Sequence, residues 1–523
     1  MKYIYPIIVF LITTIGYGQN LPNFEVENLN VNDSYSNFGA AYFGESDLVF
    51  SSTKGRGMTS WVNPKNQNVF YNLYKGRVKD SISLEDVRRF KPSFLSSFHE
   101  SNLVFSKGLD VVYITQSNQR NGRFVEGAEG TVNLKVYKFE KDASGEWSEM
   151  IDLPFNSDNY SVAHPALSPD GKTLYVSSNR PDSFGDTDIY KIEINEDGSY
   201  GPMINLGSMV NSQHRESFPY FGDNLVLYFS SDRPGGMGGL DIYASKQISN
   251  YYSEPVSLDY PINSKEDDFS FIIKSASNTG YFSSNRAGGK GGDDIYSFRQ
   301  TQLLDFKCQQ LVEGQVLDQD NMEALSDVSV ILLDDFGNAL QSTVTDLQGN
   351  YNFVVDCNSN YSVMVNHFEY YRAEKLVNTS DLSNEVNIYN LSLEKEVIVK
   401  NEKEQLNLNT IFFEINSSYL TKDAMTELLK VVETMQKYPG MEIAIGSHTD
   451  SSAEAAYNLW LSDRRAKRTR DFIIENGIEG SRISAKGYGE QELLNKCSDN
   501  VECSEEEHAE NRRSEFVIVK SEQ

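Results

Sequence analysis

The alternation of hydrophobic and polar residues defines three regions of the chain. Between about residues 30 and 300, runs such as Leu174-Tyr175-Val176-Ser177 alternate in polarity and follow turns such as Pro169-Asp170-Gly171. A period of two is typical of strands that bury one face, and Pro, Asp and Gly mark the turns between them. The first region is therefore predicted to consist of small antiparallel sheets.

An internal repeat divides the first region into units. Three units contain a Ser-Ser-Asn/Asp-Arg sequence followed by an Asp-Ile-Tyr sequence, which ends at Tyr190, Tyr243 and Tyr296. Tyr137 lies one repeat length before Tyr190, and a degenerate copy of the unit ends at Tyr74. Several successive four-stranded sheets are typical of a β-propeller, whose radial packing hides the strand edges. We predict an all-β propeller of about five blades over residues 25–302. The sequence leaves open a sixth blade from the region after residue 75.

Two features of the repeat bear on its role. Residues 165–171 and 175–180 resemble the PD40, or WD40-like, repeat of the TolB family. An aspartate also recurs at one equivalent place in three units, which could indicate calcium binding. Because each aspartate lies in a different blade, turn capping is the favoured interpretation. These residues are Asp188, Asp241 and Asp294.

The second region, residues 308–394, contains period-two runs broken by Asp and Gly turns. This pattern predicts a small β-sandwich. The region resembles the carboxypeptidase-regulatory-like, transthyretin-like module, which implies a spacer or adhesive role. Residues 395–408 are charged and lack a sustained apolar period, so they are predicted to form a linker.

Strands and helices alternate in the third region, residues 409–520, which predicts an α+β domain. One helix is expected from Thr421 to Tyr438, before the Pro439-Gly440 stop. A second, longer helix should close at Asn476-Gly477, where glycine suits the left-handed helix end. Strands are expected at 411–413, 442–446, 482–489 and 511–519.

Four motifs of the third region resemble the OmpA-like, or Pal-like, peptidoglycan-binding domain. They are His448-Thr449-Asp450, the Tyr-Asn-x-x-Leu-Ser-x-x-Arg-Ala sequence at 457–466, Gly487-Tyr488-Gly489-Glu490 and Asn511-Arg512-Arg513. The resemblance implies a non-covalent clamp on the diaminopimelate of the wall's stem peptide. In that clamp Asp450 takes the ligand's ammonium and Arg465 takes its carboxylate. The other residues implied to bind peptidoglycan are Thr449, Asn458, Leu461 and Arg512.

The chemistry of the ligand fits this assignment. Diaminopimelate presents a zwitterionic end, which requires one fixed anion and one cation, and Arg matches a carboxylate with two parallel donors. By their spacing, Asn458 and Arg465 share one helical face with either Leu461 or Ser462. On one straight helix Asp450 and Arg465 would lie roughly 22 Å apart. Asp450 must therefore lie in a loop, with the helix beginning near Tyr457; a start at Ser452 would contradict the clamp.

Ordinary structural roles are the alternative for these residues. Taken alone, Asp450 could be a helix N-cap and Arg465 a solvated helix charge. His448 is predicted to be structural, because no nucleophile or metal partner accompanies it, and Arg513 to be a surface charge.

The third region also departs from the family pattern at three positions. Ala453 stands where glycine is usual, Glu414 where the first strand usually has Asp, and Ser447 where Gly is common. We expect Ala453 to alter the loop that presents Asp450, which would affect affinity more than specificity.

The N-terminus predicts export. An apolar run from Ile4 to Ile15 precedes Gly16-Tyr17-Gly18, which is the pattern of a secretory signal peptide, residues 1–18. No later stretch approaches the roughly 18 apolar residues of a membrane helix. The first cysteine is Cys308, so a lipid anchor at the cleavage site is not expected. We predict a periplasmic protein associated with the outer membrane and the cell wall.

Charge and cysteine content narrow the partners further. The formal net charge of -28, from 47 basic and 75 acidic residues, makes nucleic acid an unsuitable partner. In an oxidising compartment the even cysteine count fits two disulfides, Cys308 with Cys357 and Cys497 with Cys503, with buried free thiols as the alternative.

The combined pattern predicts a non-enzymatic envelope scaffold without metal or cofactor. The domain order resembles the PorE-like envelope proteins of Bacteroidetes that accompany the type IX secretion and gliding machinery, which implies an outer-membrane partner of the PorP/SprF kind. The alternatives are a glycan-binding propeller or a glycosidase built on opposed carboxylates. The acids placed by the repeat lie on turns, and no HExxH, GxSxG or Cys-His signature appears.

Overall fold

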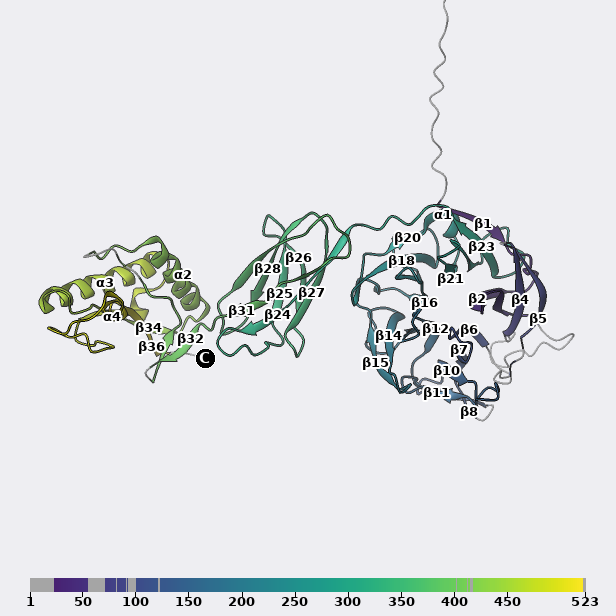
Figure 1. Ribbon diagram of the computed structural model, residues 1–523, viewed down its shortest axis with the longest axis horizontal. Helices are drawn as coiled ribbons and strands as arrows, with labels where there is room; N and C mark the ends of the chain where they lie inside the picture. The colour runs from purple at the N-terminus through teal and green to yellow at the C-terminus, as the bar shows by residue number, and fades with distance from the viewer. Residues whose placement is uncertain are drawn as a thin grey trace, which may run out of the picture. The chain divides into compact units, whose positions relative to one another are not determined.

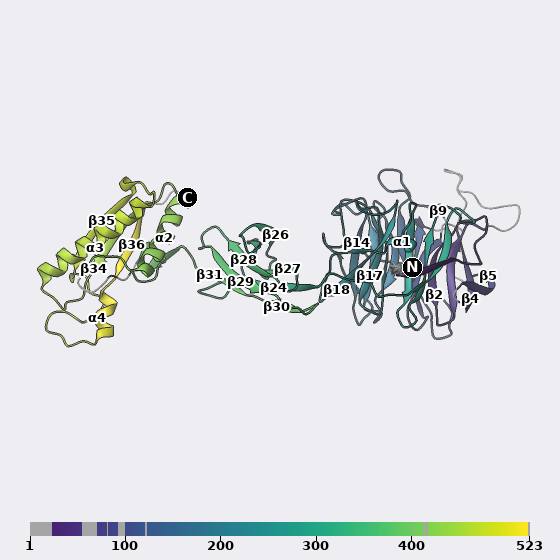
Figure 2. The ribbon, with the colours of Figure 1, turned by 90° about the horizontal axis from the view of Figure 1, so that it is seen from above.

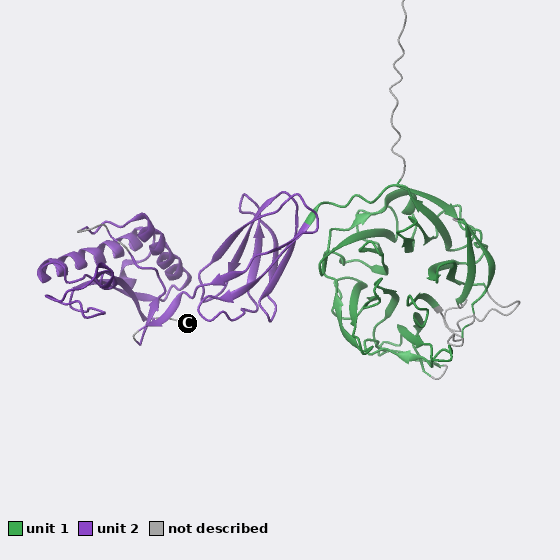
Figure 3. Cartoon of the chain, in the orientation of Figure 1, with its two compact units in different colours: residues 1–309 green, residues 310–523 purple. Residues whose placement is uncertain are grey.

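The computed structural model describes residues 23–54, 71–80, 82–90, 92, 100–120, 123–400, 402–411, 413 and 417–520. The predicted signal peptide and Glu414 lie outside these residues. The chain divides into two compact units, residues 1–309 and 310–523 (Figure 3). Of the helices in the described residues, none has the length and the apolar content needed to cross a membrane.

Within its described residues, the first unit contains five antiparallel sheets of four or five strands (Figure 1). In four of them the strands pair in the order in which they occur in the sequence. The first contains β2(Asn37–Phe43), β3(Asp47–Ser52), β4(Asn72–Asp80) and β5(Ser83–Arg89), and the second contains β6(Glu100–Phe105), β7(Val111–Ser117), β10(Leu134–Glu140) and β11(Ile151–Asp152). The third contains β12(Val162–Leu167), β13(Thr173–Ser178), β14(Asp188–Ile194) and β15(Tyr200–Asn205), and the fourth contains β16(Glu216–Phe221), β17(Val226–Ser231), β18(Asp241–Ile248) and β19(Tyr251–Tyr252), with β20(Val256–Ser257) also paired to β18. The fifth joins β21(Asp268–Lys274), β22(Thr279–Ser284) and β23(Asp294–Gln300) to β1(Phe24–Asn28). A ribbon of β8(Gln119–Arg120) and β9(Arg123–Phe124) and the short α1(Asp259–Ile262) complete this part.

The five sheets form a ring (Figure 1), which Figure 2 shows from its edge. Their first strands contact one another in the order β2, β6, β12, β16 and β21, and β21 contacts β2. The start of the chain closes the last sheet, because Phe24 of β1 pairs with Gln300 of β23. Ring closure leaves each sheet a neighbour on both faces, so the apolar residues of both faces are buried. The repeat tyrosines Tyr137, Tyr190, Tyr243 and Tyr296 all lie in third strands.

The recurring aspartates end the turns before those third strands. Asp241 Oδ2 accepts hydrogen bonds from the backbone N–H groups of Met237 and Gly238, at 2.6 and 3.0 Å. Asp188 and Asp294 accept equivalent pairs of backbone hydrogen bonds in their own turns. These contacts agree with turn capping, since each carboxylate satisfies two donors of its own loop.

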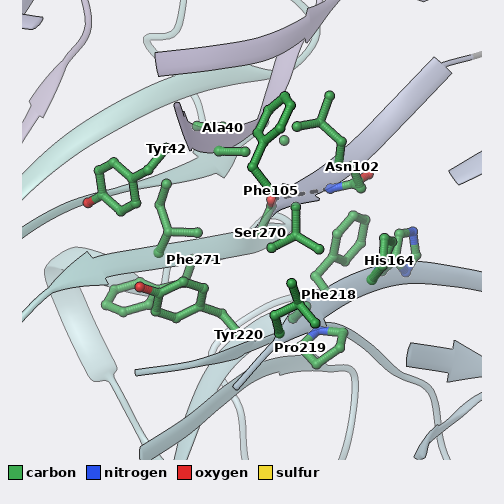
Figure 4. A pocket seen from close by; sticks show the side chains of 18 residues that line it. Ala40, Tyr42, Asn102, Phe105, His164, Phe218, Pro219, Tyr220, Ser270 and Phe271 are labelled. Atoms are coloured by element: carbon green, nitrogen blue, oxygen red, sulfur yellow. Dashed lines mark hydrogen bonds between the residues drawn. The ribbon is translucent and has the colours of Figure 1, made fainter. Parts of the chain in front are cut away.

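Each first strand carries a β-bulge at the same place. The residue at each bulge has a positive φ, and four of the five are not glycine, so packing must hold a strained backbone there. These side chains surround a cavity of about 200 Å³ at the centre of the ring (Figure 4). The ring of His164 stacks on that of Phe218, with centroids 3.8 Å apart. The bulge residues are Gly39, Asn102, His164, Phe218 and Ser270.

The second unit begins with two facing sheets that share one apolar core. One sheet contains β24(Gln309–Asp318), β27(Asn350–Asp356), β30(Val386–Ile388) and β31(Leu391–Leu393), and the other contains β25(Ser329–Leu333), β26(Ala339–Val344), β28(Asn360–Asn366) and β29(Ala373–Asn378). Alternate residues of β25 and β28, such as Val330 and Val363, are fully buried between the sheets. This arrangement is the one the period-two pattern predicts.

The segment expected to be a linker is instead an ordered hairpin. Strands β32(Val397–Lys400) and β33(Lys403–Leu406) pair with each other, and β33 joins the sheet of the C-terminal module through Gln405 and Val517. Leu406 is buried in that module's core, and Glu396 pairs with Lys437 at 2.8 Å. Lys400, Lys403 and Glu404 are exposed at the turn end of the hairpin, so the charge pattern hides the strand period there.

The C-terminal module packs helices on a mixed sheet. The sheet order is β32-β33-β36-β34-β35, with β34(Glu442–His448), β35(Ile483–Gly489) and β36(Ser514–Lys520). The helices are α2(Lys422–Lys437), α3(Ala455–Glu475), the 3-10 turn η1(Gly480–Arg482) and α4(Glu505–Asn511). Thr421 caps α2 by accepting the Ala424 N–H, and Gly477 has a φ of 99° after α3, as predicted. Of the strand expected at 411–413, the described residues show only a bridge between Phe413 and Leu420.

All four cysteines are oxidised. Cys497 and Cys503 form a disulfide with Cα atoms 5.9 Å apart, and Cys308 and Cys357 are also disulfide-bonded. The alternative of buried free thiols is therefore wrong.

Candidate ligand-binding site

The predicted site residues of the C-terminal module surround one cavity of about 610 Å³. Its walls come from the end of β34, the loop after it, the first half of α3 and the end of α4. Residues far apart in the chain thus meet here: Thr449, Asp450, Asn458, Leu461, Arg465 and Arg512.

Asp450 lies in the loop between β34 and α3. Helix α3 begins at Ala455, and its N-cap is Glu454, whose side chain makes no capping hydrogen bond. Asp450 Oδ1 accepts the Ser452 N–H at 3.1 Å, which is a contact inside the loop. The N-cap alternative for Asp450 is therefore wrong, and the geometric condition for the clamp is met.

The Asp450 carboxylate is buried and anionic. Its Oδ2 lies 2.6 Å from Nη1 of Arg512, whose other terminal nitrogen pairs with Glu505. Burial by itself would raise the pKa of Asp450, but hydrogen bonds from Arg512 and Ser452 outweigh it, and the pKa lies below its ordinary value. An ionised carboxylate offers about four acceptor positions, and Arg512 and Ser452 do not use all of them.

Arg465 projects from the buried face of α3. Only 8% of the residue is exposed, its Nε donates to the Ser417 carbonyl at 3.0 Å, and its guanidinium lies 4.9 Å from the Phe413 ring centre. Burial lowers the pKa of Arg465, and the negative charge of Asp450 opposes that shift. Arg465 is therefore not a solvated helix charge, and it lies within the electrostatic range of Asp450.

Asn458, which the resemblance implies as a peptidoglycan-binding residue, lines the cavity and also holds the loop of Asp450. Its Nδ2 donates to the carbonyl groups of Asp450 and Ala453, at 3.0 and 2.9 Å, and to Glu490 Oε2 at 2.5 Å. These bonds tie the loop to the first turns of α3. Asn458 positions Asp450, and Ala453 takes part through its backbone alone.

Glycines let α3 approach the sheet closely. A Cβ on Gly487 would lie 2.1 Å from the backbone nitrogen of Asp463. The Gly489 N–H donates to Ser462 Oγ at 2.9 Å, which fixes the helix against β35. The Gly-Tyr-Gly motif therefore sets the distance between Arg465 and the loop of Asp450.

The two residues before Asp450 are buried polar groups. Thr449 donates its backbone N–H to the Gly489 carbonyl, and within the described residues its hydroxyl has no hydrogen-bond partner. The His448 ring stacks on Tyr488 at 5.1 Å, and burial together with the charge of Arg513 lowers the pKa of His448. Its packing supports the structural role predicted for it.

Sequence reasoning missed part of the cavity wall and misplaced Arg513. Arg513 is largely buried and pairs with Glu515 at 2.8 Å, so it is not a surface charge. Glu505, which supports Arg512, went unnoticed, although Ser504 and Glu507 form the capping box that starts α4 and could have located it. The apolar wall residues Ile411 and Phe413 were placed in a strand rather than in the site.

The similarities to known proteins described next concern this module. Residues 412–507 match the OmpA family. The chain is 33% identical over 108 residues to a peptidoglycan-associated lipoprotein of Rhizobium meliloti, covering 21% of this chain and 58% of that protein. It is 36% identical over 107 residues to outer membrane porin F of Pseudomonas aeruginosa, covering 20% of this chain and 29% of that protein. The chain thus spans less than two thirds of the length of these relatives.

Among solved structures, the peptidoglycan-associated lipoprotein from Burkholderia pseudomallei aligns with 21% of this chain and 88% of its own chain, at 22% identity and a TM-score of 0.19. The family match shows that the C-terminal module is OmpA-like.

Proposed function

We propose that the protein is an envelope scaffold that binds peptidoglycan non-covalently through the cavity of its C-terminal module. The match to the OmpA family over residues 412–507 supports this, as do relatives that carry the name peptidoglycan-associated lipoprotein. The observation that carries the proposal is one cavity lined by a buried anion, Asp450, and a buried cation, Arg465.

The cavity suits the zwitterionic end of diaminopimelate. Asp450 would accept a hydrogen bond from the ligand's ammonium, and Arg465 would donate to the ligand's carboxylate. Both charges act in a partly desolvated site, where ionic hydrogen bonds are stronger than in water. Because both side chains are held before binding, little conformational entropy is lost when the ligand enters.

The remaining predicted residues support these two contacts. Arg512 keeps Asp450 ionised, and Leu461 offers an apolar wall to the ligand's methylene chain. The unpartnered Thr449 hydroxyl is available to a polar group of the ligand. Asn458 acts on the loop rather than on the ligand.

The rest of the chain would decide what is tethered to the wall. We interpret the five-sheet ring as a β-propeller of the PD40 type and the next module as a carboxypeptidase-regulatory-like spacer. They would present a surface to an outer-membrane protein of the PorP/SprF kind in the type IX secretion machinery of the periplasm. In this proposal the chain acts by binding and catalyses no reaction.

The test is retention of the exported chain on purified sacculi. Asp450→Ala and Arg465→Ala should each weaken binding by roughly thirtyfold or more, because each leaves an opposite charge of the bound ligand unpaired. Asp463→Ala and Arg470→Ala are matched controls, since both are partly exposed charges of α3 outside the cavity. Retention of both cavity variants at the level of the unmodified protein would contradict the clamp.

A further inference from the structure

Helix α3 presents two neighbouring rows of side chains with different environments. Asn458, Leu461 and Arg465 form the buried row that lines the cavity. One residue earlier in each case lie Tyr457, Trp460 and Arg464, which are exposed. On a helix these rows are adjacent, separated by about 100°. The exposed row therefore runs along the rim of the cavity.

The exposed row is a continuous aromatic and cationic surface, called here the aromatic strip (Tyr457, Trp460 and Arg464). The rings of Tyr457 and Trp460 lie 5.6 Å apart with a 33° tilt. The Arg464 guanidinium lies 5.0 Å from the Trp460 ring centre. Trp460 is 50% exposed and Tyr457 36% exposed, although large aromatic side chains are normally buried.

Tyr457 connects the strip to the cavity, because it belongs to both. A ligand in the cavity that continues past Tyr457 meets Trp460 next. From Tyr457 to Arg464 the helix rises about 10 Å, which is long enough to lie along two sugar rings.

We propose that the aromatic strip is a saccharide subsite that binds the glycan strand to which the stem peptide is attached. The inference rests on the proposed function, since a stem peptide held in the cavity brings its covalently linked sugars to the rim. A sugar ring has an apolar C–H face and polar edges. The Trp460 and Tyr457 rings offer flat apolar surfaces, and Arg464 offers N–H donors to hydroxyl and acetamido oxygens.

The surroundings of the strip favour a saccharide over a membrane or a protein helix. The exposed residues Lys467 and Arg468 follow it on α3, and Lys467 pairs with the half-buried Asp463 at 2.7 Å. A broad contiguous apolar patch is what lipid and protein interfaces use. A narrow strip with a guanidinium at one end has the mixed character of a carbohydrate surface.

The test compares two ligands by isothermal titration calorimetry with the full exported chain. One is a free stem tetrapeptide containing diaminopimelate, and the other is the same peptide linked to its disaccharide. The unmodified protein should bind the disaccharide-linked peptide about threefold to tenfold more tightly than the free peptide, which is the range of one aromatic contact. Trp460→Ala should bind both ligands with the affinity that the unmodified protein has for the free peptide.

Two variants serve as controls. Trp460→Phe should keep most of the preference for the linked sugar, because it keeps an aromatic face. Leu429→Ala removes an exposed apolar side chain of α2 and should leave the preference unchanged. Thermal unfolding of each variant checks that it is folded.

Distinct outcomes overturn distinct parts of the inference. Equal affinity of the unmodified protein for both ligands, or a preference that survives in Trp460→Ala, overturns the saccharide subsite while leaving the cavity in place. If Trp460→Ala lowers the affinity for both ligands by the same factor, Trp460 belongs to the cavity instead. Binding to phosphatidylethanolamine–phosphatidylglycerol vesicles that Trp460→Ala abolishes assigns the strip to a membrane. Failure of the unmodified protein to bind either ligand refutes the proposed function itself.

Discussion

The side-chain amide of Asn458 donates a hydrogen bond of 3.0 Å to the backbone carbonyl of Asp450. This bond joins the buried face of a helix to the loop that presents the site's anion. The loop is therefore positioned by α3, the helix that also carries Arg465. One helix thus fixes the positions of both the Asp450 carboxylate and the Arg465 guanidinium.

Asn458→Ala should lower both stability and ligand affinity. It removes the donor to two carbonyl groups of the loop, one of them buried, which should cost about 2 kcal/mol in the free energy of unfolding. It should also weaken retention on sacculi, because Asp450 is no longer held. Denaturant unfolding and sacculus binding measure the two effects. Asn476→Ala, which removes an exposed amide at the end of the same helix, should change neither by much; equal effects of the two substitutions would refute the positioning role.

Arg512→Ala should shift the pH dependence of binding. With Arg512 present, the pKa of Asp450 lies below its ordinary value of 3.8, so the carboxylate stays ionised into the acid range. A lowered pKa in the folded state contributes stability that is present above about pH 4 and is lost as the pH falls through the folded pKa. Without Arg512 the remaining effect of burial raises that pKa. The pH at which half of the sacculus binding is lost should therefore move upward in Arg512→Ala and stay in place in Arg470→Ala. An unchanged or lower midpoint in Arg512→Ala would contradict the assigned role.

Gly487→Ala should destabilise the C-terminal module. The added Cβ would lie 2.1 Å from the backbone nitrogen of Asp463, so α3 would have to move away from β35. Such overpacking costs about 1–3 kcal/mol. Gly480→Ala is the control, because its nearest neighbour is the flexible end of Ile474 at 3.2 Å. The unfolding temperature of Gly487→Ala should lie clearly below that of Gly480→Ala. An unfolding temperature of Gly487→Ala equal to that of the unmodified protein would mean that α3 is not held against β35.

Asp241→Ala should destabilise the first unit without involving a metal. Two backbone N–H groups of the turn lose the acceptor that the buried Asp241 carboxylate provides, at a cost of about 2–4 kcal/mol. Asp197→Ala, in an exposed turn, should cost less than about 1 kcal/mol. Calcium and a chelator should leave the unfolding temperature of the unmodified protein unchanged. A rise with calcium that Asp241→Ala abolishes would show a metal site instead of a turn cap.

Local signals predicted most of the secondary structure. The Asp-Ile-Tyr repeat located the third strands of three sheets, Thr421 located the start of α2, and Gly477 located the end of α3. Each of these depends on neighbours within one turn or one hairpin. The hairpin at 397–406 was missed because its strand character depends on pairing with β36, more than a hundred residues later.

The sequence by itself determined the periodic burial, the turns and the residue types that the site needs, because these follow from backbone preferences and from the period of apolar residues. Only the tertiary structure decided that β1 closes the ring against β23 and that Arg512 reaches Asp450 across 62 residues. It also decided that Asn458 serves the loop and that Trp460 stays exposed beside the cavity. Contacts between distant segments depend on how whole elements pack, and no local period encodes that packing.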